Sequence, residues 1–448
     1  MDWLLQVLTV FDRWLWGNWL LFVLLGVGVW YTVISGGVQI RYFRQILKKT
    51  LWEPVRQKGR GKAAEGTISS FQALCTAVAS CVGSGNIVGV STAVLAGGMG
   101  ALFWMWVAAF LGMATKYGEI VLGMLYREKD ETGAWTGGPM YYIEKGLHAP
   151  WLAALCAGFM VVQIIGGNLI QSNTVSGLVK ECFRIPLWVT GGVLVAVIFL
   201  VSTGGLKGLA QVSQRLVPAM AVLYAAGGVV ILLANISRIP GVIRDIFAGA
   251  FGLRAAAGGA LGSMMAAMEK GIARGLYSNE AGEGSAPVIH SAAQVNHPAE
   301  QGIMGVAEVF VDTFLLCTIT GLVLGVTGAA DSGGAGYLLV AEAFASVWKP
   351  LGYVVSLSLI LFCVTTLMSQ WYFGYVGLNY LWGRRVAGKF RYIFPVFCMA
   401  GALLEMELVW TIQDIALGLL TIPNLCALAV LWPEVGQATK EYFGEEQK

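Results

Sequence analysis

The chain has 448 residues, of which 57% are hydrophobic and only 12% are charged, with a formal net charge of +3. Soluble proteins carry roughly 25% charged residues because these side chains face water, so the composition excludes a soluble enzyme and a disordered chain. The small net charge also argues against a nucleic-acid partner. A mean hydropathy of +0.69 and 59 glycines instead predict a polytopic membrane protein with closely packed helices.

Apolar stretches long enough to cross a bilayer recur along the chain. A membrane helix needs about 20 mostly apolar residues. This window predicts spans near 18–38, 67–96, 101–125, 151–178, 186–204, 216–236, 254–272, 302–328, 350–375, 392–404 and 412–431. Of the 29 Lys and Arg residues, 21 then fall on one side. The positive-inside rule predicts an outer N-terminus and a cytoplasmic C-terminus, in the cytoplasmic membrane.

The order of the eleven spans suggests an internal repeat. The first span stands apart, and the ten that follow divide into two groups of five that enter the membrane from opposite sides. This is the topology of an inverted repeat. We therefore expect an all-α fold with an N-terminal unit (1–66), two five-helix repeats (67–240 and 241–432) and a cytoplasmic tail (433–448).

The second span contains the run Gly83-Ser84-Gly85-Asn86, which is a poor helix former. Broken backbone at membrane depth is tolerated only where protein or a cavity satisfies its polar groups. The freed N–H groups attract a carboxylate, and the freed C=O groups attract a cation. We expect these four residues to bind substrate. The alternative is a small-residue packing face through Gly85 and Gly89.

The fourth span carries side-chain amides at Gln163, Asn168, Gln171 and Asn173. Amides in hydrocarbon need hydrogen-bond partners. Contacts between helices are the alternative for each of them. Because four lie so close together, we expect substrate ligands among Gln163, Asn168 and Gln171.

The seventh span is interrupted by small residues between Gly258 and Ser263. In an inverted repeat this interruption is the counterpart of the Gly83 run. We expect Gly259, Leu261 and Gly262 to contact substrate from the second half. The glycine-rich segment 274–287 that follows lacks the spacing of a phosphate-binding loop, and we expect it to act as a gate or as a link between helices.

The ninth span places two hydroxyls at Thr365 and Thr366. Hydroxyl oxygens are hard, neutral ligands that suit Na⁺. With backbone carbonyls of Ala79 and Val82, freed beside Gly83, they predict a sodium site. The alternative is that both threonines bond back to their own helix.

Ionisable residues within the spans have more than one interpretation. Lys116 and Glu119 are three residues apart on one helix face, and we expect them to pair. Glu308 and Asp312 share a face and could serve proton transfer or packing. The three histidines are expected in polar loops, and the eight cysteines are scattered, so we expect neither a transition-metal site nor an organic cofactor. No catalytic motif is present, which argues against an enzyme.

Several segments together resemble the alanine or glycine:cation symporter family, the sodium:alanine symporters. The similar segments are Phe71–Leu74, Gly83–Ile87, Phe103–Trp106, Gly112–Lys116, Gly137–Ile143, Gly167-Asn168 with Gln171, Arg274-Gly275, Ser278–Gly282 and Gly284–Pro287. The resemblance implies the leucine-transporter type of 5+5 inverted repeat, preceded by one extra helix. It also implies Na⁺-coupled uptake of small amino acids, with Gly83–Asn86 as the broken helix. In the family the cation site corresponds to Thr365 and Thr366 with the carbonyls near Ala79 and Val82.

Two departures from that family pattern stand out. Glu283 replaces a residue that is often apolar. In the ninth span the register counted from Thr366 places Gln370, rather than a tryptophan, in the pocket, with Trp371 one residue later. One residue turns a helix by 100°, so both cannot face the pocket equally. We expect a substrate larger or more polar than alanine, such as glutamine.

The sequence therefore predicts a Na⁺-coupled symporter for a small neutral amino acid, either alanine, glycine or glutamine, in a lipid bilayer. An H⁺-coupled symporter using Glu308, Asp312 or Glu119 is the alternative. A sensor or channel is less favoured because the polar residues cluster near mid-membrane rather than forming a continuous stripe.

Overall fold

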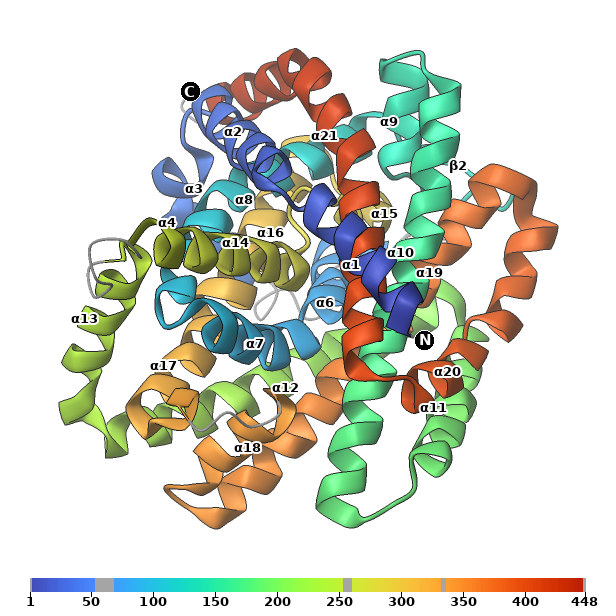
Figure 1. Ribbon diagram of the computed structural model, residues 1–448. Coiled ribbons are helices and arrows are strands. Elements are labelled where there is room, and N and C mark those ends of the chain that lie inside the picture. Colours follow the sequence, from blue (N-terminus) through green and yellow to red (C-terminus); the bar gives the residue numbers. More distant parts are fainter. Residues whose placement is uncertain (1, 53–67, 253–259, 332–335, 446–448) are drawn as a thin grey trace.

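The computed structural model describes residues 2–52, 68–252, 260–331 and 336–445, and nearly all of these residues are helical (Figure 1). The chain begins with α1 (Asp2–Leu15), α2 (Asn18–Ile34), α3 (Val38–Arg41), α4 (Phe43–Leu47) and the π-helical turn η1 (Lys48–Trp52). The first two helices lie on the rest of the bundle, since α1 packs on α21 and α2 on α8. Two hydrogen bonds hold them there: Trp16 Nε1 donates to the Asp414 carbonyl at 2.8 Å, and Tyr31 Oη donates to the Leu428 carbonyl at 2.8 Å.

The next part of the chain begins with a broken helix. Its elements are α6 (Ser70–Cys81), η2 (Ser84–Asn86), α7 (Val88–Gly97), α8 (Gly100–Leu125), α9 (Pro139–Gly146), α10 (Pro150–Phe183), α11 (Leu187–Ser202) and α12 (Gly205–Ala234). Ser69 and Gln72 form a capping box that starts α6. A bend of 59° separates α6 from the helix that continues after η2. The interruption predicted at Gly83 is therefore present.

The remaining elements continue from α12 to the C-terminus. They are η3 (Ile236–Arg238), α13 (Ile239–Ala250), α14 (Ala260–Asn279), α15 (Ala286–His290), α16 (Pro298–Val309), η4 (Phe310–Cys317), α17 (Thr318–Thr327), η5 (Ala329–Asp331), α18 (Gly336–Ala345), α19 (Lys349–Ile393), α20 (Val396–Leu403) and α21 (Met406–Glu445). The π-helix η4 joins α16 to α17 without a break. Gly383, with φ of 75°, kinks α19. Helix α21 continues through most of the segment expected to be a C-terminal tail.

The strands are two short pairs. β1 (Ile68–Ser69) pairs in parallel with β4 (Ala293–Gln294), and β2 (Glu128–Lys129) pairs antiparallel with β3 (Trp135–Thr136). The first pair joins the start of α6 to the segment that follows α15. It therefore joins two segments that are more than 200 residues apart in the sequence.

Seven helices of the described chain are long and apolar enough to cross a membrane, or eight if the bent pair α6–α7 counts as one span. Helices α11 and α18 are apolar but shorter. Two helices, α13 and α18, occupy stretches expected to connect spans. In α13, Val242, Ile246 and Ala250 repeat every four residues and are buried, so one face packs on α8 and α14. Such a short amphipathic helix contains no 20-residue apolar window.

The centre of the molecule lies around α8, α10 and α14. Helix α8 packs on α14 and α16, whereas α10 packs on α19, α20 and α21. In Figure 1, α13 lies at one edge of the bundle and α11 and α20 at the opposite edge, with α6, α8 and α14 between them. This arrangement brings the break after α6 close to the end of α14.

Candidate functional site

The first helix break is closed by its own asparagine. Helix α6 ends at Cys81, and Val82 leaves the helical conformation with ψ of 93°. The Gly83 N–H then donates to Asn86 Oδ1 at 2.9 Å, within the break itself. Asn86 therefore holds the interrupted backbone at membrane depth, as such a break requires.

Glycines 83 and 85 are required by close approach of neighbouring helices. A Cβ on Gly83 would lie 2.6 Å from Thr366 Oγ1, and a Cβ on Gly85 would lie 2.9 Å from Ser278 Cα. The break is thereby pressed against α19 on one side and against α14 on the other. A simple packing face between two straight helices does not account for this geometry.

A further break, which was not predicted, lies at the C-terminal end of α14. Gly258 and Gly259 are outside the described residues, but α14 is regular from Ala260, and Gly262 in its first turn is exposed. The chain leaves the helix after Asn279, where Glu280 adopts φ of +56°. At 1.5 Å per residue, Gly262 lies about 24 Å from Ser278 along the helix axis.

We define residues 280–285 as the second break. The Asn279 side chain caps its start, since Oδ1 accepts from the Ala281 N–H at 3.0 Å. Leu261 and Gly262, which were expected at an interruption, lie in the first turn of α14, whereas Gly259 lies outside the described residues. Small residues do not interrupt a helix by themselves when no neighbouring group competes for the backbone.

Three buried side chains join the first break to α10 and α14. Gln171 Oε1 accepts from the Ser84 N–H at 3.0 Å, and its Nε2 donates to Tyr277 Oη at 3.4 Å. Ser84 Oγ and Tyr277 Oη are 3.1 Å apart. Ser84 and Gln171 were predicted from sequence, but Tyr277 was not, although it lies in the glycine-rich segment assigned a gating or linking role.

Asp312 ties both breaks to the π-helical turn of η4. Its Oδ1 accepts from Asn86 Nδ2 at 2.5 Å, and its Oδ2 accepts from Ser278 Oγ at 2.9 Å. Asp312 is fully buried. Single π-turns are frequent at functional sites because they redirect side chains that a regular helix would turn away. Sequence reasoning left the role of Asp312 open.

Two hydroxyls of α19 point at α6, and one of them was not predicted. Thr366 Oγ1 lies 3.2 Å from the Val82 carbonyl and 3.0 Å from the Phe362 carbonyl of its own helix, and Ser369 Oγ lies 3.2 Å from the Thr76 carbonyl. The two residues are three apart and share a helix face. The three-residue spacing from Thr366 could have identified Ser369 from the sequence. Ala79, buried on α6, lies one turn before Val82.

Thr365 is directed elsewhere. Its Oγ1 donates to carbonyls of its own helix, at Leu361 and Phe362, and lies 3.7 Å from Met220 Sδ on α12. One residue rotates a helix by 100°, so Thr365 cannot share the face of Thr366. Of the two threonines expected at the sodium site, only Thr366 contacts the broken helix.

The polar cluster of α10 divides into two groups. Asn168 Nδ2 donates to the Phe394 carbonyl at 2.9 Å, and Asn173 Nδ2 donates to the Leu404 carbonyl at 2.7 Å, so both join α10 to the α19–α20 region. These hydrogen bonds fit the helix-packing alternative for Asn168. Gln163, Gly167 and Gln171 follow one another at intervals of four residues along α10.

The register question in α19 has a geometric answer. The Gln370 amide lies against α10, since a Cβ on Gly167 would be 2.4 Å from Gln370 Nε2. Trp371 instead stacks near Tyr375, with ring centroids 5.8 Å apart. The residue that faces α10 at this level is therefore Gln370.

The buried charges pair differently from expectation. Lys116 Nζ is 2.5 Å from Glu308 Oε1 and donates to the Asn279 carbonyl at 2.6 Å. Glu119 instead accepts from Asn424 Nδ2 at 2.5 Å. The expected Lys116–Glu119 pair is absent among these described contacts because α16 brings Glu308 closer to the lysine.

A histidine and a second glutamate extend this network. His290 is fully buried at the end of α15, 3.1 Å from Glu308 Oε2, rather than in a polar loop. Glu283, the residue that departs from the family pattern, is also buried, with 1% of its surface exposed. Among the described residues, no group of three or more His, Cys, Asp or Glu could hold a metal ion.

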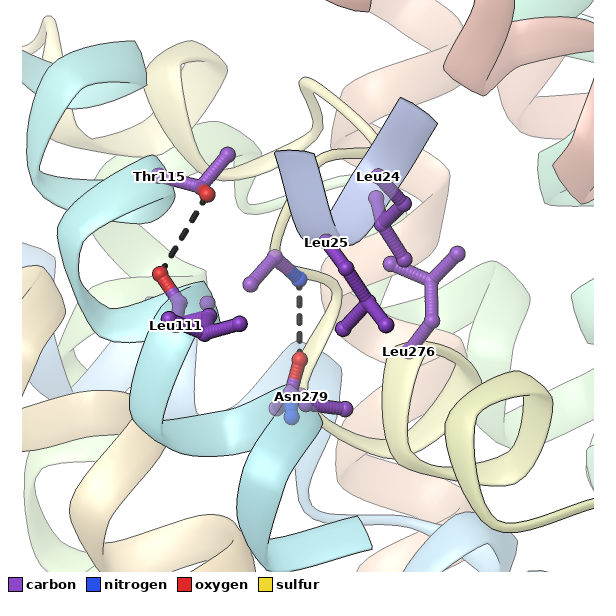
Figure 2. A pocket seen from close by; sticks show the side chains of 9 residues that line it. Leu24, Leu25, Leu111, Thr115, Leu276 and Asn279 are labelled. Atoms are coloured by element: carbon purple, nitrogen blue, oxygen red, sulfur yellow. Dashed lines mark hydrogen bonds between the residues drawn. The ribbon is translucent and has the colours of Figure 1, made fainter. Parts of the chain in front are cut away.

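A small cavity adjoins the second break (Figure 2). Leu24 and Leu25 of α2, Thr115 of α8, and Leu276 and Asn279 of α14 lie around it, and its volume is about 10 Å³. That is room for about one water molecule. This cavity is too small for an amino acid, so the candidate site remains the junction of Ser84, Gln171 and Tyr277.

Comparison with known proteins places this arrangement in a family. The model of the sodium:alanine symporter family matches residues 1–448. An uncharacterized transporter of Haemophilus influenzae is 42% identical over 98% of this chain and 96% of its own. The sodium/alanine symporter AgcS of Methanococcus maripaludis is 39% identical, over 99% of this chain and 98% of its own.

A solved structure shares the fold at low sequence identity. The crystal structure of MhsT in complex with L-phenylalanine has a TM-score of 0.57 and 17% identity, covering 83% of this chain and 90% of that one. The fold thus agrees with the family assignment made from sequence. The protein belongs to the sodium:alanine symporter family.

Proposed function

We propose that this protein is a secondary transporter that couples Na⁺ entry to uptake of a small neutral amino acid, either alanine, glycine or glutamine. The observation that carries the proposal is the break between α6 and α7, where exposed backbone meets Gln171 on one side and Thr366 on the other. Membership of the sodium:alanine symporter family supports the same assignment.

The substrate carboxylate would bind at the N-terminal end of α7. The Ser84 N–H is now taken by Gln171 Oε1 at 3.0 Å, which shows that an acceptor oxygen fits there. A carboxylate in that position gains a charge-assisted hydrogen bond and the favourable end of the helix dipole. Tyr277 Oη, 3.1 Å from Ser84 Oγ, would offer a second donor.

The coupling Na⁺ would bind between α6 and α19. The candidate ligands are the Thr366 and Ser369 hydroxyls with the carbonyls of Ala79 and Val82, all hard neutral oxygens. Na⁺ there would stabilise the C-terminal end of α6, whose dipole favours a cation. Because substrate and Na⁺ bind the same broken helix, each would raise the affinity for the other.

The transport cycle would use two inverted five-helix halves of an eleven-helix fold, residues 67–240 and 241–432. In support, each half contains a helix that breaks and resumes, α6–α7 in the first and α14–α15 in the second. The N-terminus would lie outside, and the halves would alternately open the site to each side of the membrane.

Proton coupling is the second candidate, favoured by one observation. Glu119 is fully buried, and its Oε2 has no hydrogen-bond partner among the described residues. Glu308 is paired with Lys116 and His290, and Asp312 accepts three side-chain hydrogen-bond donors, so these two carboxylates are already engaged.

The test is uptake by purified protein in liposomes. Radiolabelled alanine, glycine and glutamine would be supplied with either an inward Na⁺ gradient or a pH gradient. We expect accumulation with Na⁺ alone, unaffected by a protonophore. Uptake driven by the pH gradient without Na⁺ would establish the second candidate, and no uptake under either gradient would reject symport of these amino acids.

A further inference from the structure

Two adjacent glycines of α10 lie beneath side-chain amides from two other helices. A Cβ on Gly167 would lie 2.4 Å from Gln370 Nε2 of α19, and a Cβ on Gly166 would lie 2.4 Å from Gln413 Oε1 of α21. Gln163 lies three and four residues before these glycines and so shares their face of α10. We call Gln163, Gln370 and Gln413 the amide cluster.

The amide cluster is buried, yet its hydrogen bonds are incomplete. The exposed fractions of Gln163, Gln370 and Gln413 are 2%, 3% and 0%. No hydrogen-bond partner among the described residues reaches Gln163 Oε1, Gln370 Oε1 or either polar atom of the Gln413 amide. The neighbouring Trp371 Nε1 is also without one. Buried polar atoms are nearly always satisfied, so this concentration indicates a polar ligand.

The free atoms match one kind of side chain. They comprise acceptor oxygens on all three glutamines and the N–H donors of Gln413. A carboxamide presents both N–H donors and a carbonyl acceptor, so it can satisfy both sets. A carboxylate presents acceptors only, and an aliphatic side chain presents neither. Rotation of the glutamine amides exchanges donors with acceptors but preserves this mixed character.

The amide cluster also lies at a suitable distance from the proposed carboxylate site. Gly167 and Gln171 are four residues apart on α10, which corresponds to about 6 Å along the helix. An amino acid whose carboxylate binds at the Ser84 N–H could therefore extend its side chain over Gly167. The Gln370 amide lies against this glycine and would be the first polar group that such a side chain meets.

We propose that Gln163, Gln370 and Gln413 form a side-chain subsite that selects amino acids with a side-chain carboxamide, glutamine above alanine. This inference rests on the proposed function and specifies its substrate class. Gln413 is the specificity residue that this proposal adds, because it lies on α21, outside the ninth predicted span and outside both helix breaks. The glycines at positions 166 and 167 let the Gln413 and Gln370 amides lie directly against the backbone of α10.

The test compares ligands of similar size and variants of one helix. Wild-type protein in liposomes would take up labelled alanine and labelled glutamine, with unlabelled glutamine, glutamate and norleucine as competitors. We expect glutamine to compete at concentrations at least tenfold below those of glutamate and norleucine. Gln413→Leu should weaken glutamine relative to alanine by about 10- to 100-fold, the range expected for lost buried hydrogen bonds.

Controls separate specificity from folding. Gln437→Leu makes the same change at an exposed site on α21, where the amide bonds only Glu441, and should leave the ratio of glutamine to alanine unchanged. If Gln413→Leu does not fold, Gly166→Ala tests the same point, since its Cβ would displace the Gln413 amide. Thermal unfolding in detergent reports whether each variant is folded.

The possible failures are distinguishable. Alanine uptake with no preference for glutamine over norleucine would overturn the inference and leave the proposed function standing. An equal loss of alanine and glutamine affinity in folded Gln413→Leu would also overturn it, because that result indicates a structural role. Absence of any amino-acid uptake by folded wild-type protein would overturn the proposed function together with the inference.

Discussion

The two helix breaks of this transporter are built from different chemistry. The backbone and hydroxyl groups of the break at Gly83–Asn86 contact neutral groups, the amide of Gln171 and the hydroxyls of Thr366 and Tyr277, and among the described residues its one contact with a carboxylate is the hydrogen bond from Asn86 to Asp312. The second break at 280–285 contains two buried glutamates and adjoins the Lys116–Glu308 ion pair. Neutral hydrogen bonds can be exchanged for those of a ligand at little cost, whereas a buried ion pair is expensive to open. We infer that the first break binds ligands and that the second anchors the helices around them.

The largest expected effect comes from breaking the buried ion pair between Lys116 and Glu308 beside the second break. Lys116→Met leaves Glu308 buried without its cation, which should lower the free energy of unfolding by about 3–5 kcal/mol. Thermal unfolding in detergent would measure this loss. Lys145→Met removes a pair of the same 2.5 Å length whose partners are 40% and 47% exposed, so it should cost less than about 1 kcal/mol. Equal melting of the two variants would show that the buried pair does not anchor the second break.

The next effect should come from filling the first break. Gly83→Ala places a Cβ 2.6 Å from Thr366 Oγ1, so the approach of α19 is lost and transport should fall by about 100-fold or more, equivalent to roughly 3 kcal/mol. Gly262→Ala is the matched control, because no atom lies within 4 Å of its added Cβ. Uptake rates in liposomes would compare them. If Gly262→Ala reduced uptake as much as Gly83→Ala, the first turn of α14 would belong to the transport site, as predicted from sequence.

A smaller effect distinguishes the two threonines of α19. Thr366→Val removes a hydroxyl that faces Val82, and we expect the Na⁺ concentration for half-maximal uptake to rise about tenfold, equivalent to roughly 1.4 kcal/mol. Thr365→Val removes a hydroxyl that bonds within its own helix, and Na⁺ dependence should change by less than about threefold. The reverse order of effects would place the sodium site between α19 and α12.

The smallest effect is expected at a packing amide. Asn168→Ala removes the hydrogen bond to the Phe394 carbonyl and should destabilise the protein by about 1 kcal/mol without changing KM. Gln171→Ala, one turn away on α10, should instead raise KM because it alters the Ser84 site. A change in KM for Asn168→Ala would contradict its assignment to helix packing.

The sequence predicted the first break correctly because the cause is local. Gly83, Ser84 and Gly85 are poor helix formers, and Asn86 supplies the acceptor that closes the turn within three residues. The break at 280–285 was not predicted because its cause is not local. Small residues at 260–263 remain helical, whereas the chain leaves the helix at Glu280, where Ser80 and Ser285 donate to its carboxylate.

As with the helix breaks, only some residues of the candidate site were identified from the sequence. Ser84, Gln171 and Thr366 were identified because a polar side chain within a membrane span is costly unless it has a structural or functional role. Tyr277, Ser369 and Gln413 were not among the predicted residues, because a single tyrosine, serine or glutamine within a helix becomes informative only when the facing helix is known.

What the sequence by itself determined was the class of protein, the helical architecture, the position of the Gly83 break and the family. These follow from composition, hydrophobic length and local backbone preference, which each segment carries independently of its neighbours. Only the tertiary structure decided that Lys116 pairs with Glu308, that Thr366 rather than Thr365 faces α6, and that Gln413 and Gln370 lie against Gly166 and Gly167. The physical reason is that a buried polar side chain bonds whichever group another helix brings within about 3 Å, and that choice depends on helix rotation, which apolar patterning in a membrane leaves unspecified.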